Sequence, residues 1–273
     1  MFDLVSEQPA YDRSLIDAML SSCRRATLPY QQAHRGDLFG TAFWFNDLLS
    51  EDADGTATYD QYLVTAGAST RCSIAEIRMR PELSESALSA NGLLMTDFQQ
   101  GWIPLGDSGV SVLPATALHA LARRKGWAWA TDEITEGLAA KAEDIEALGD
   151  APVSAYVLGH DVGPDRTQRE QAVILGEVMR SGDGHGFVWR GPVPQGCVGA
   201  PVFVGIGLEG RNVKLVCLGV LLSREGEGER ALNPVATFDR IRTDMRRLPE
   251  QEAPAPEADS APPPRSRRWR RRV

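Results

Sequence analysis

The sequence predicts an all-β fold with a helix near each end. Short apolar runs recur along the 273-residue chain and are separated by polar or glycine-rich turns. Apolar residues at the three- and four-residue spacing of a helix occur mainly near the two ends of this pattern. Regularly spaced short strands of this kind are typical of β-barrels and β-sandwiches. The strands fall into two groups, one on each side of a polar stretch near the middle of the chain.

The first half of the pattern begins with a predicted helix at residues 12–25. Leu15, Met19 and Cys23 recur there at four-residue intervals and share one face. Residues 52–60 (DADGTATYD) are polar and predict a turn. The strands predicted for this half are 38–45, 61–67, 72–80 and 109–115, followed by a short helix at 115–124.

The second half begins with a polar or helical connection through residues 133–149. Five further strands are predicted after it, at 152–160, 170–180, 184–191, 201–206 and 212–222. Residues 234–248 then show helical spacing at Phe238, Ile241 and Met245. The predicted order is therefore a helix, two groups of strands and a C-terminal helix.

Composition and charge exclude several classes of protein. The net charge of −8 argues against a whole surface that binds nucleic acid. No apolar run approaches the roughly 18 residues of a membrane span, and the N-terminal residues do not resemble a signal peptide. The four cysteines, Cys23, Cys72, Cys197 and Cys217, show no metal-ligand spacing. We therefore expect reduced thiols, a cytoplasmic location, no metal and no cofactor.

Residues 249–273 differ from the rest of the chain and predict a disordered tail. The segment is rich in Pro, Ala and Glu, and then in Arg, and it lacks the apolar residues of a core. Its last nine residues, RSRRWRRRV, hold six arginines and one tryptophan, which suits an anionic partner. A merely solvated tail is the alternative. The candidate binding residues of the tail are Arg267, Arg268, Trp269, Arg270, Arg271 and Arg272.

Residues 195–203 (QGCVGAPVF) predict a tight turn that leads into a strand. Gly196 and Gly199 permit backbone conformations that other residues disfavour, and Val202 and Phe203 are strand formers. Such a turn presents one side chain and several backbone N–H groups. The residue at its centre is Val198, which has no chemically reactive group.

Three segments in this order resemble the trypsin-like serine proteases of bacterial type. GTAFWF resembles the strand near the start of that family, YLVTAGAST resembles its histidine segment, and GCVGAPVF resembles its nucleophile turn. SGVSVLP resembles the short strand that carries the aspartate. The resemblance covers roughly residues 36–248 and implies two six-stranded antiparallel β-barrels around a cleft. The barrels would span roughly 36–125 and 150–235, with an N-terminal helical segment at 1–35, a C-terminal helix at 235–248 and the tail at 249–273.

The resemblance also places three residues at the positions of the catalytic triad. Ala68 matches the histidine, Gly109 the aspartate and Val198 the serine. None of these side chains exchanges a proton, so the triad mechanism lacks its groups at these positions. We therefore expect a pseudoprotease rather than an enzyme, with a protein or peptide partner in the cleft. The N–H groups of Gly196 and Val198 match the oxyanion hole and are the candidate binding groups.

Two other hypotheses remain open at this point. Cys197, Ser69 and Asp107 lie one or two positions from the replaced groups, so a peptidase with a displaced centre at Cys197 is possible. A buried structural role is the alternative for Cys197. In the third hypothesis the barrels are a scaffold, and the arginine-rich tail carries binding.

Overall fold

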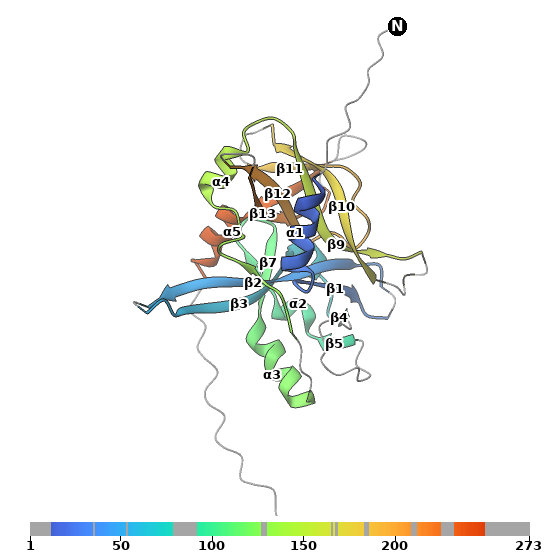
Figure 1. The fold of residues 1–273 in the computed structure, drawn as a ribbon. Helices are drawn as coiled ribbons and strands as arrows, with labels where there is room; N and C mark the ends of the chain where they lie inside the picture. The colour runs from blue at the N-terminus through green and yellow to red at the C-terminus, as the bar shows by residue number, and fades with distance from the viewer. Residues whose placement is uncertain are drawn as a thin grey trace, which may run out of the picture.

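Two β-sheet units make up most of the computed structural model, with helices around them (Figure 1). The structure describes residues 12–34, 36–52, 54–78, 92–126, 130–164, 166, 169–182, 186–208, 212–224 and 232–248. The predicted all-β fold with two barrel-like units is confirmed. The predicted tail, with its six candidate binding residues, lies outside the described residues.

The first unit is an eight-stranded sheet that does not close on itself within the described residues. Its strands follow the order β5-β4-β1-β2-β3-β7-β6, and β8 pairs with β2 in parallel. The resemblance implied six strands in a closed barrel, so this unit differs in strand number and closure. Its strands are β1 (Thr27–Gln32), β2 (Phe39–Glu51), β3 (Ala57–Ala66), β4 (Ile74–Arg78), β5 (Gly92–Thr96), β6 (Ile103–Leu105), β7 (Val110–Pro114) and β8 (Ile134–Thr135).

The second unit is a closed six-stranded antiparallel barrel, as the resemblance implied. The strands follow each other around the ring in the order β10-β11-β14-β13-β12-β9. Their bounds are β9 (Val153–Val162), β10 (Arg169–Arg180), β11 (Phe187–Arg190), β12 (Pro201–Gly207), β13 (Val213–Leu221) and β14 (Asn233–Thr237). Closure leaves this unit without an unpaired sheet edge.

Short helices lie around the two β units (Figure 1). α1 begins after Asp12, whose carboxylate accepts a hydrogen bond of 2.8 Å from the N–H of Ser14 and caps the helix. The predicted face of α1, with Leu15, Met19 and Cys23, is buried. The helices are α1 (Arg13–Cys23), α2 (Phe98–Gly101), α3 (Ala115–Lys125), α4 (Ala142–Ala147) and α5 (Phe238–Met245), and η1 (Gly67–Thr70) is a short 3₁₀ turn.

Three sequence predictions need correction here. β1 lies at 27–32, within the stretch predicted as an N-terminal helical segment, so the first sheet begins before residue 36. Residues 57–60 belong to β3 and not to a turn, because they pair with β2. The C-terminal helix begins only at Phe238, because the preceding residues form β14 and pair with both β11 and β13 to close the barrel.

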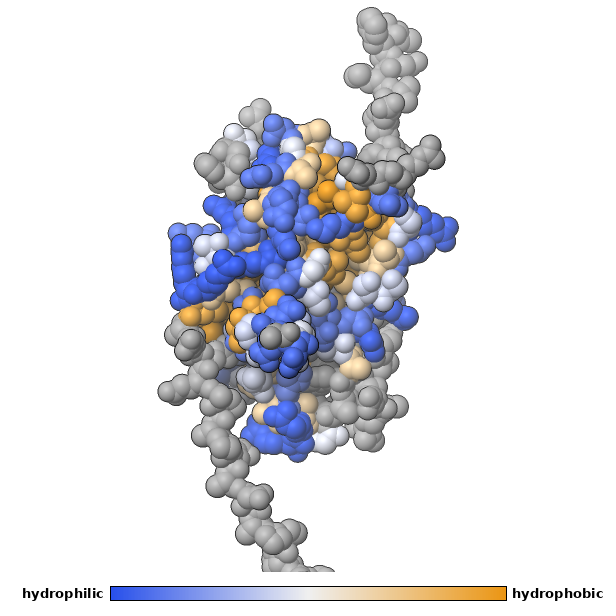
Figure 2. Space-filling model, turned by 60° about the vertical axis from the view of Figure 1, so that its left-hand side comes forward, coloured by the Kyte–Doolittle hydropathy of each residue, from blue (hydrophilic) through white to orange (hydrophobic). Residues whose placement is uncertain are grey.

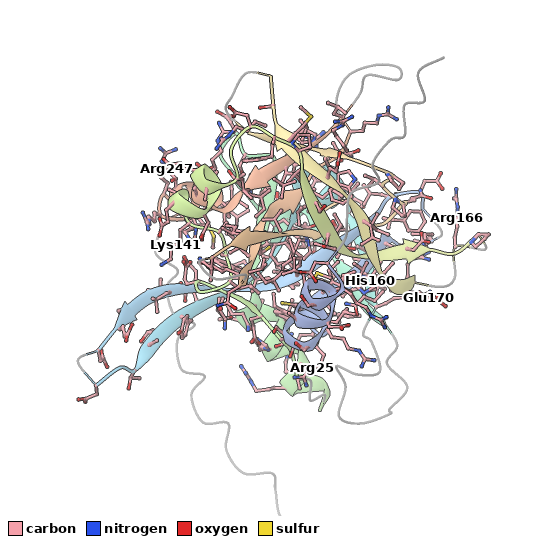
Figure 3. The ribbon with its side chains drawn as sticks, turned by 45° about the horizontal axis from the view of Figure 1, so that its top comes forward. Arg25, Lys141, His160, Arg166, Glu170 and Arg247 are labelled. Carbon is pink, nitrogen blue, oxygen red and sulfur yellow. The ribbon has the colours of Figure 1, made fainter. Side chains whose placement is uncertain are left out.

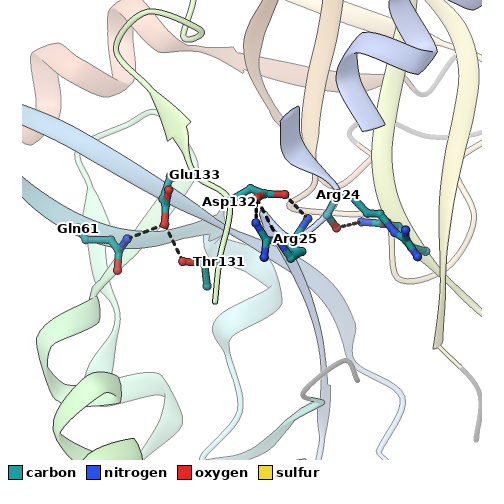
Figure 4. Close-up of polar contacts among 7 residues, drawn as sticks. Arg24, Arg25, Gln61, Thr131, Asp132 and Glu133 are labelled. Carbon is teal, nitrogen blue, oxygen red and sulfur yellow. Dashed lines mark hydrogen bonds and ion pairs between the residues drawn. The ribbon is translucent and has the colours of Figure 1, made fainter. Parts of the chain in front are cut away.

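A shared hydrophobic core joins the two units. Phe43 and Phe45 of β2 face Phe238 of α5, with ring centroids 6.3 and 5.0 Å apart. Phe203 of the second barrel belongs to the same buried cluster. Figure 4 shows how the connection between the units is fixed beside this core: Asp132 accepts a 2.8 Å hydrogen bond from the Arg25 N–H and pairs with its guanidinium at 2.7 Å.

Candidate functional site

A groove runs along the boundary between the two units. Two neighbouring pockets form it, with volumes of about 710 and 530 Å³, and both are lined by Ala68 and Ser223. The first unit contributes Phe39 and the η1 turn to the larger pocket, and the second barrel contributes residues 189–196 and Val198. A groove of this kind is a common location for a binding site.

The structure brings the three triad-equivalent residues of the sequence to this groove. Ala68 and Val198 line the larger pocket, and Ala68 and Gly109 line the smaller one. The N–H of Gly67 donates a 2.8 Å hydrogen bond to the carbonyl of Gly109, which holds η1 against the turn before β7. The assignment of these residues to triad positions remains a prediction from the resemblance.

The turn at residues 195–201 depends on its two glycines. Gly196 and Gly199 have φ values of +103° and +87°, which L side chains rarely adopt. A Cβ atom at Gly199 would collide with the side chain of Thr65 and the carbonyl of Thr41. A Cβ atom at Gly196 would instead collide with the carbonyl of His160 in β9. Gly199 therefore lets the turn lie close to the first unit, and Gly196 lets it lie close to β9.

A buried hydrogen-bond network holds the turn from the side of the first unit. The hydroxyl of Thr41 donates 2.7 Å to the carbonyl of Gly196, and the Thr41 N–H donates 2.9 Å to the carbonyl of Val198. Thr65 donates 2.7 Å to the Thr41 carbonyl, and the Tyr30 hydroxyl lies 2.9 Å from the Thr65 oxygen. The sequence analysis missed this network.

His160 completes the network from the second barrel. Its backbone N–H donates 3.2 Å to the Thr41 hydroxyl, and its Nδ1 lies 3.5 Å from the same oxygen. The side chain is fully buried. His160 therefore positions Thr41 and the turn.

The backbone donors of the turn are oriented by this network and are not used within it. No other described residue accepts a hydrogen bond from the N–H of Gly196 or of Val198. The next N–H, that of Gly199, donates 2.8 Å to the carbonyl of Leu221. Both Gly196 and Val198 line the larger pocket. Cys197 lies between them and donates its N–H to the carbonyl of Pro194 at 3.1 Å. The site can therefore offer the two N–H groups on either side of Cys197 to an oxygen acceptor in the groove.

Cys197 does not face the groove. Its side chain is fully buried in the core of the second barrel and lies against Gly159. Burial, followed by the charge of Asp161, raises the pKa of the thiol to about 12, so the thiolate is scarce at neutral pH. The geometry favours the structural role of Cys197 over the role of a displaced nucleophile.

The other two displaced candidates lie apart from each other. Ser69 lines the larger pocket but is almost fully buried. Asp107 lines a different pocket, next to Asp239 and Arg240 of α5. The structure therefore does not assemble Cys197, Ser69 and Asp107 into one centre. Among the residues that the structure describes, no group of three or more His, Cys, Asp or Glu side chains could hold a metal ion.

No protein-family model and no curated protein matches the chain. Solved structures do match. A serine endoprotease from Yersinia pestis matches with 11% identity and a TM-score of 0.47, over 87% of this chain and 67% of that one. A protease from M. tuberculosis in its active form matches with 12% identity and a TM-score of 0.44, over 90% and 93%. Catalytically active tobacco etch virus protease, complexed with product, matches with 8% identity and a TM-score of 0.45, over 88% and 82%.

This chain combines a closed six-stranded ring and a second, open β unit, with a groove between them. This architecture is consistent with the two-barrel fold of the trypsin-like serine proteases. The prediction that the chain is not an enzyme is wrong: the solved structures similar to it include proteases in active form, and no observation shows a loss of activity in this chain. Apolar or absent side chains at Ala68, Gly109 and Val198 do not establish that this chain lacks activity. In the part of the chain that the structure describes, no helix is long and apolar enough to cross a membrane.

Proposed function

We propose that this trypsin-like chain binds extended peptide segments in the groove between its two units. The observation that carries the proposal is the pair of N–H groups of Gly196 and Val198, which line the groove and donate to no other described residue. A peptide carbonyl oxygen has two lone pairs, so it can accept from two N–H donors of one turn. The protein or peptide partner is the one that the resemblance led us to expect.

The length of the groove supports an extended ligand. The two pockets meet at Ala68 and Ser223, so together they form one continuous surface. Ser223 lies two residues beyond the end of β13 and so outside the strands of the closed ring, where its backbone can pair with an added peptide strand. The larger pocket also has an apolar wall, with Phe39, Trp189 and Val193 among its lining residues, which suits an apolar side chain of the peptide.

Peptide binding is tested with a random-peptide library selected against the wild-type chain. An enriched peptide, made with a fluorescent label, is then titrated with wild type and with Ala68→Trp, which fills the groove at the junction of its pockets. Ala68 is exposed, so the substitution leaves the core intact. We expect Ala68→Trp to weaken binding by about tenfold or more, as for an obstructed central contact.

The matched control is Ala18→Trp, on the exposed face of α1. It adds the same side chain away from the groove and is expected to bind like the wild type. Equal loss in both variants, or no peptide that discriminates between wild type and Ala68→Trp, contradicts the proposal. Mass spectrometry of the same samples measures whether the bound peptide is cleaved.

A further inference from the structure

The hairpin of β2 and β3 extends away from the body as an arm (Figure 1). The first seven residues of β2 are buried in the sheet, whereas its last four are exposed. We define the arm as residues 46–61, which include five acidic residues and no Lys, Arg or His. The acidic residues of the arm are Asp47, Glu51, Asp52, Asp54 and Asp60.

The arm also exposes apolar side chains. Leu48, Leu49 and Tyr59 are 37%, 56% and 47% exposed. Figure 2, which brings this side of the molecule forward, shows hydrophobic surface next to hydrophilic surface. On the arm, exposed leucine and tyrosine side chains therefore lie beside several carboxylates. This combination suits a ligand with both cationic and aromatic groups.

Two carboxylates at the base of the arm face each other. Asp47 and Asp60 are directly paired across β2 and β3. Like charges at such positions destabilise a strand pair unless a cation lies between or beside them. Burial, followed by the charges of Glu136 and Asp60, raises the pKa of Asp47. The pair lacks a cation of its own on the arm.

A pocket of about 580 Å³ lies at this base. Asp47, Asp60, Leu48 and Leu49 line it from the arm, and Arg242 lines it from α5. Arg242 is already engaged: it pairs with Glu136 at 2.8 Å and donates to the carbonyls of Ala139 and Ala140. The remaining basic residues of the rim, Lys141 and Arg246, come from the body and not from the arm.

The chain leaves the described structure at the same pocket. Leu248 is the last described residue before the tail, and it lines the pocket together with the arm residues. Arg265 follows 17 positions later. A random-coil chain of 17 residues spans roughly 23 Å on average, a length comparable to that of the arm. Attachment at the pocket also keeps the local concentration of the tail in the range of about 1 mM.

We propose that the arm is the docking surface for the arginine-rich end of the same chain, residues 265–273. The guanidinium groups pair with the carboxylates of the arm, and arginine suits such two-pronged contacts better than lysine does. Trp269 covers the exposed leucines of the arm. Any other anionic partner of the tail therefore competes with the arm for the same arginines.

Trypsin digestion of the full chain tests this docking, because trypsin cleaves after arginine. Cleavage within residues 265–272 is followed by intact mass at low ionic strength. Docked arginines are protected, so the double variant Asp47→Asn and Asp60→Asn is expected to be cut about tenfold faster than the wild type, which corresponds to a few weak ion pairs. At about 1 M salt the difference should disappear, because exposed ion pairs are screened.

The matched control removes two carboxylates elsewhere: Asp17→Asn on α1 and Glu170→Gln on β10. Both side chains are exposed, and Figure 3 shows Glu170 on the side opposite to the arm. This control should be cut at the wild-type rate. Circular dichroism checks that the arm variant is folded, which we expect because the substitution removes a repulsion.

Two results would overturn the proposal. One is the same cleavage rate in wild type, arm variant and control. The other is protection that rises with protein concentration, since the arm would then hold the tail of a second copy. As an independent readout, Leu49→Cys and Ser266→Cys should form a disulfide within one chain, because the four described native cysteines are buried. A disulfide that forms only between chains would also show that the arm holds the tail of a second copy, and it would overturn the proposal.

Discussion

An ion pair between Asp144 and Lys214 joins α4 to the second barrel. Asp144 accepts hydrogen bonds of 2.7 and 2.9 Å from the Lys214 ammonium on β13, and a third of 3.0 Å from the Lys141 N–H. Burial alone would raise the pKa of Asp144, but these donors outweigh it and lower the pKa below the usual value. The charged form of Asp144 is therefore more stable in the folded chain than in the unfolded chain.

Asp144→Asn should lower the free energy of unfolding at pH 7 by about 1 kcal/mol, because Lys214 is partly exposed. The contribution of Asp144 is fully present above the unfolded pKa of about 3.9 and is lost as the pH falls below it. Urea unfolding at pH 7 and at about pH 3 should therefore show a smaller difference between wild type and variant at the lower pH. Glu143→Gln, on the exposed side of α4, is the control and should have little effect at either pH. An equal difference at both pH values would show that Asp144 acts by packing alone.

At the scale of one element, the turn at residues 195–201 combines backbone strain with close contact. Gly199 has a positive φ and no room for a Cβ atom, whereas Gly55 has a φ of +77° and no atom within 4 Å of that position. Alanine at Gly55 loses stability only through the unfavourable backbone conformation, whereas alanine at Gly199 also loses stability through steric collision. Gly55→Ala should cost about 1 kcal/mol, and Gly199→Ala should cost more than about 3 kcal/mol, measured by urea unfolding. If both variants lose a similar free energy of unfolding, the first unit must move away and make room for the added methyl group.

The same turn shows how far the sequence predicts a site. The glycine spacing and the apolar run after it predict the turn and β12, because both depend on neighbouring residues. The buried network cannot be predicted from neighbouring residues, because Thr41 and His160 are 119 positions apart in the sequence. Burial of Cys197 likewise follows from packing against Gly159 and not from its neighbours in the turn.

Each strand that the sequence analysis did not predict was missed for a different physical reason. Residues 57–60 were predicted as a turn because both faces of the arm are largely exposed, so no alternation marks the strand. β1 contains Pro29, which disfavours a strand prediction. β14 was included in the final helix because Phe238, Ile241 and Met245 extend the helical spacing without marking where the helix begins.

At the scale of the whole molecule, one core serves both units. The buried cluster around Phe238 includes residues of β2, α1 and the second barrel, and the open first sheet has no closed ring to stabilise it alone. Phe98, equally buried, packs instead against Tyr30 and Trp102 inside the first unit. We therefore expect the two units to unfold together in the wild type.

Phe238→Ala and Phe98→Ala test this coupling with the same chemical change. Each should destabilise the chain by about 3–5 kcal/mol, as is usual for a buried phenylalanine. Because Phe238 lies between the units, its loss should also lower the ratio of van't Hoff to calorimetric enthalpy, as the second barrel begins to unfold separately. Phe98→Ala should lower the midpoint and leave this ratio closer to one, since the shared core is intact. If differential scanning calorimetry shows the same ratio for both variants, the cluster around Phe238 does not couple the units, and the groove between them is held by the turn and its network alone.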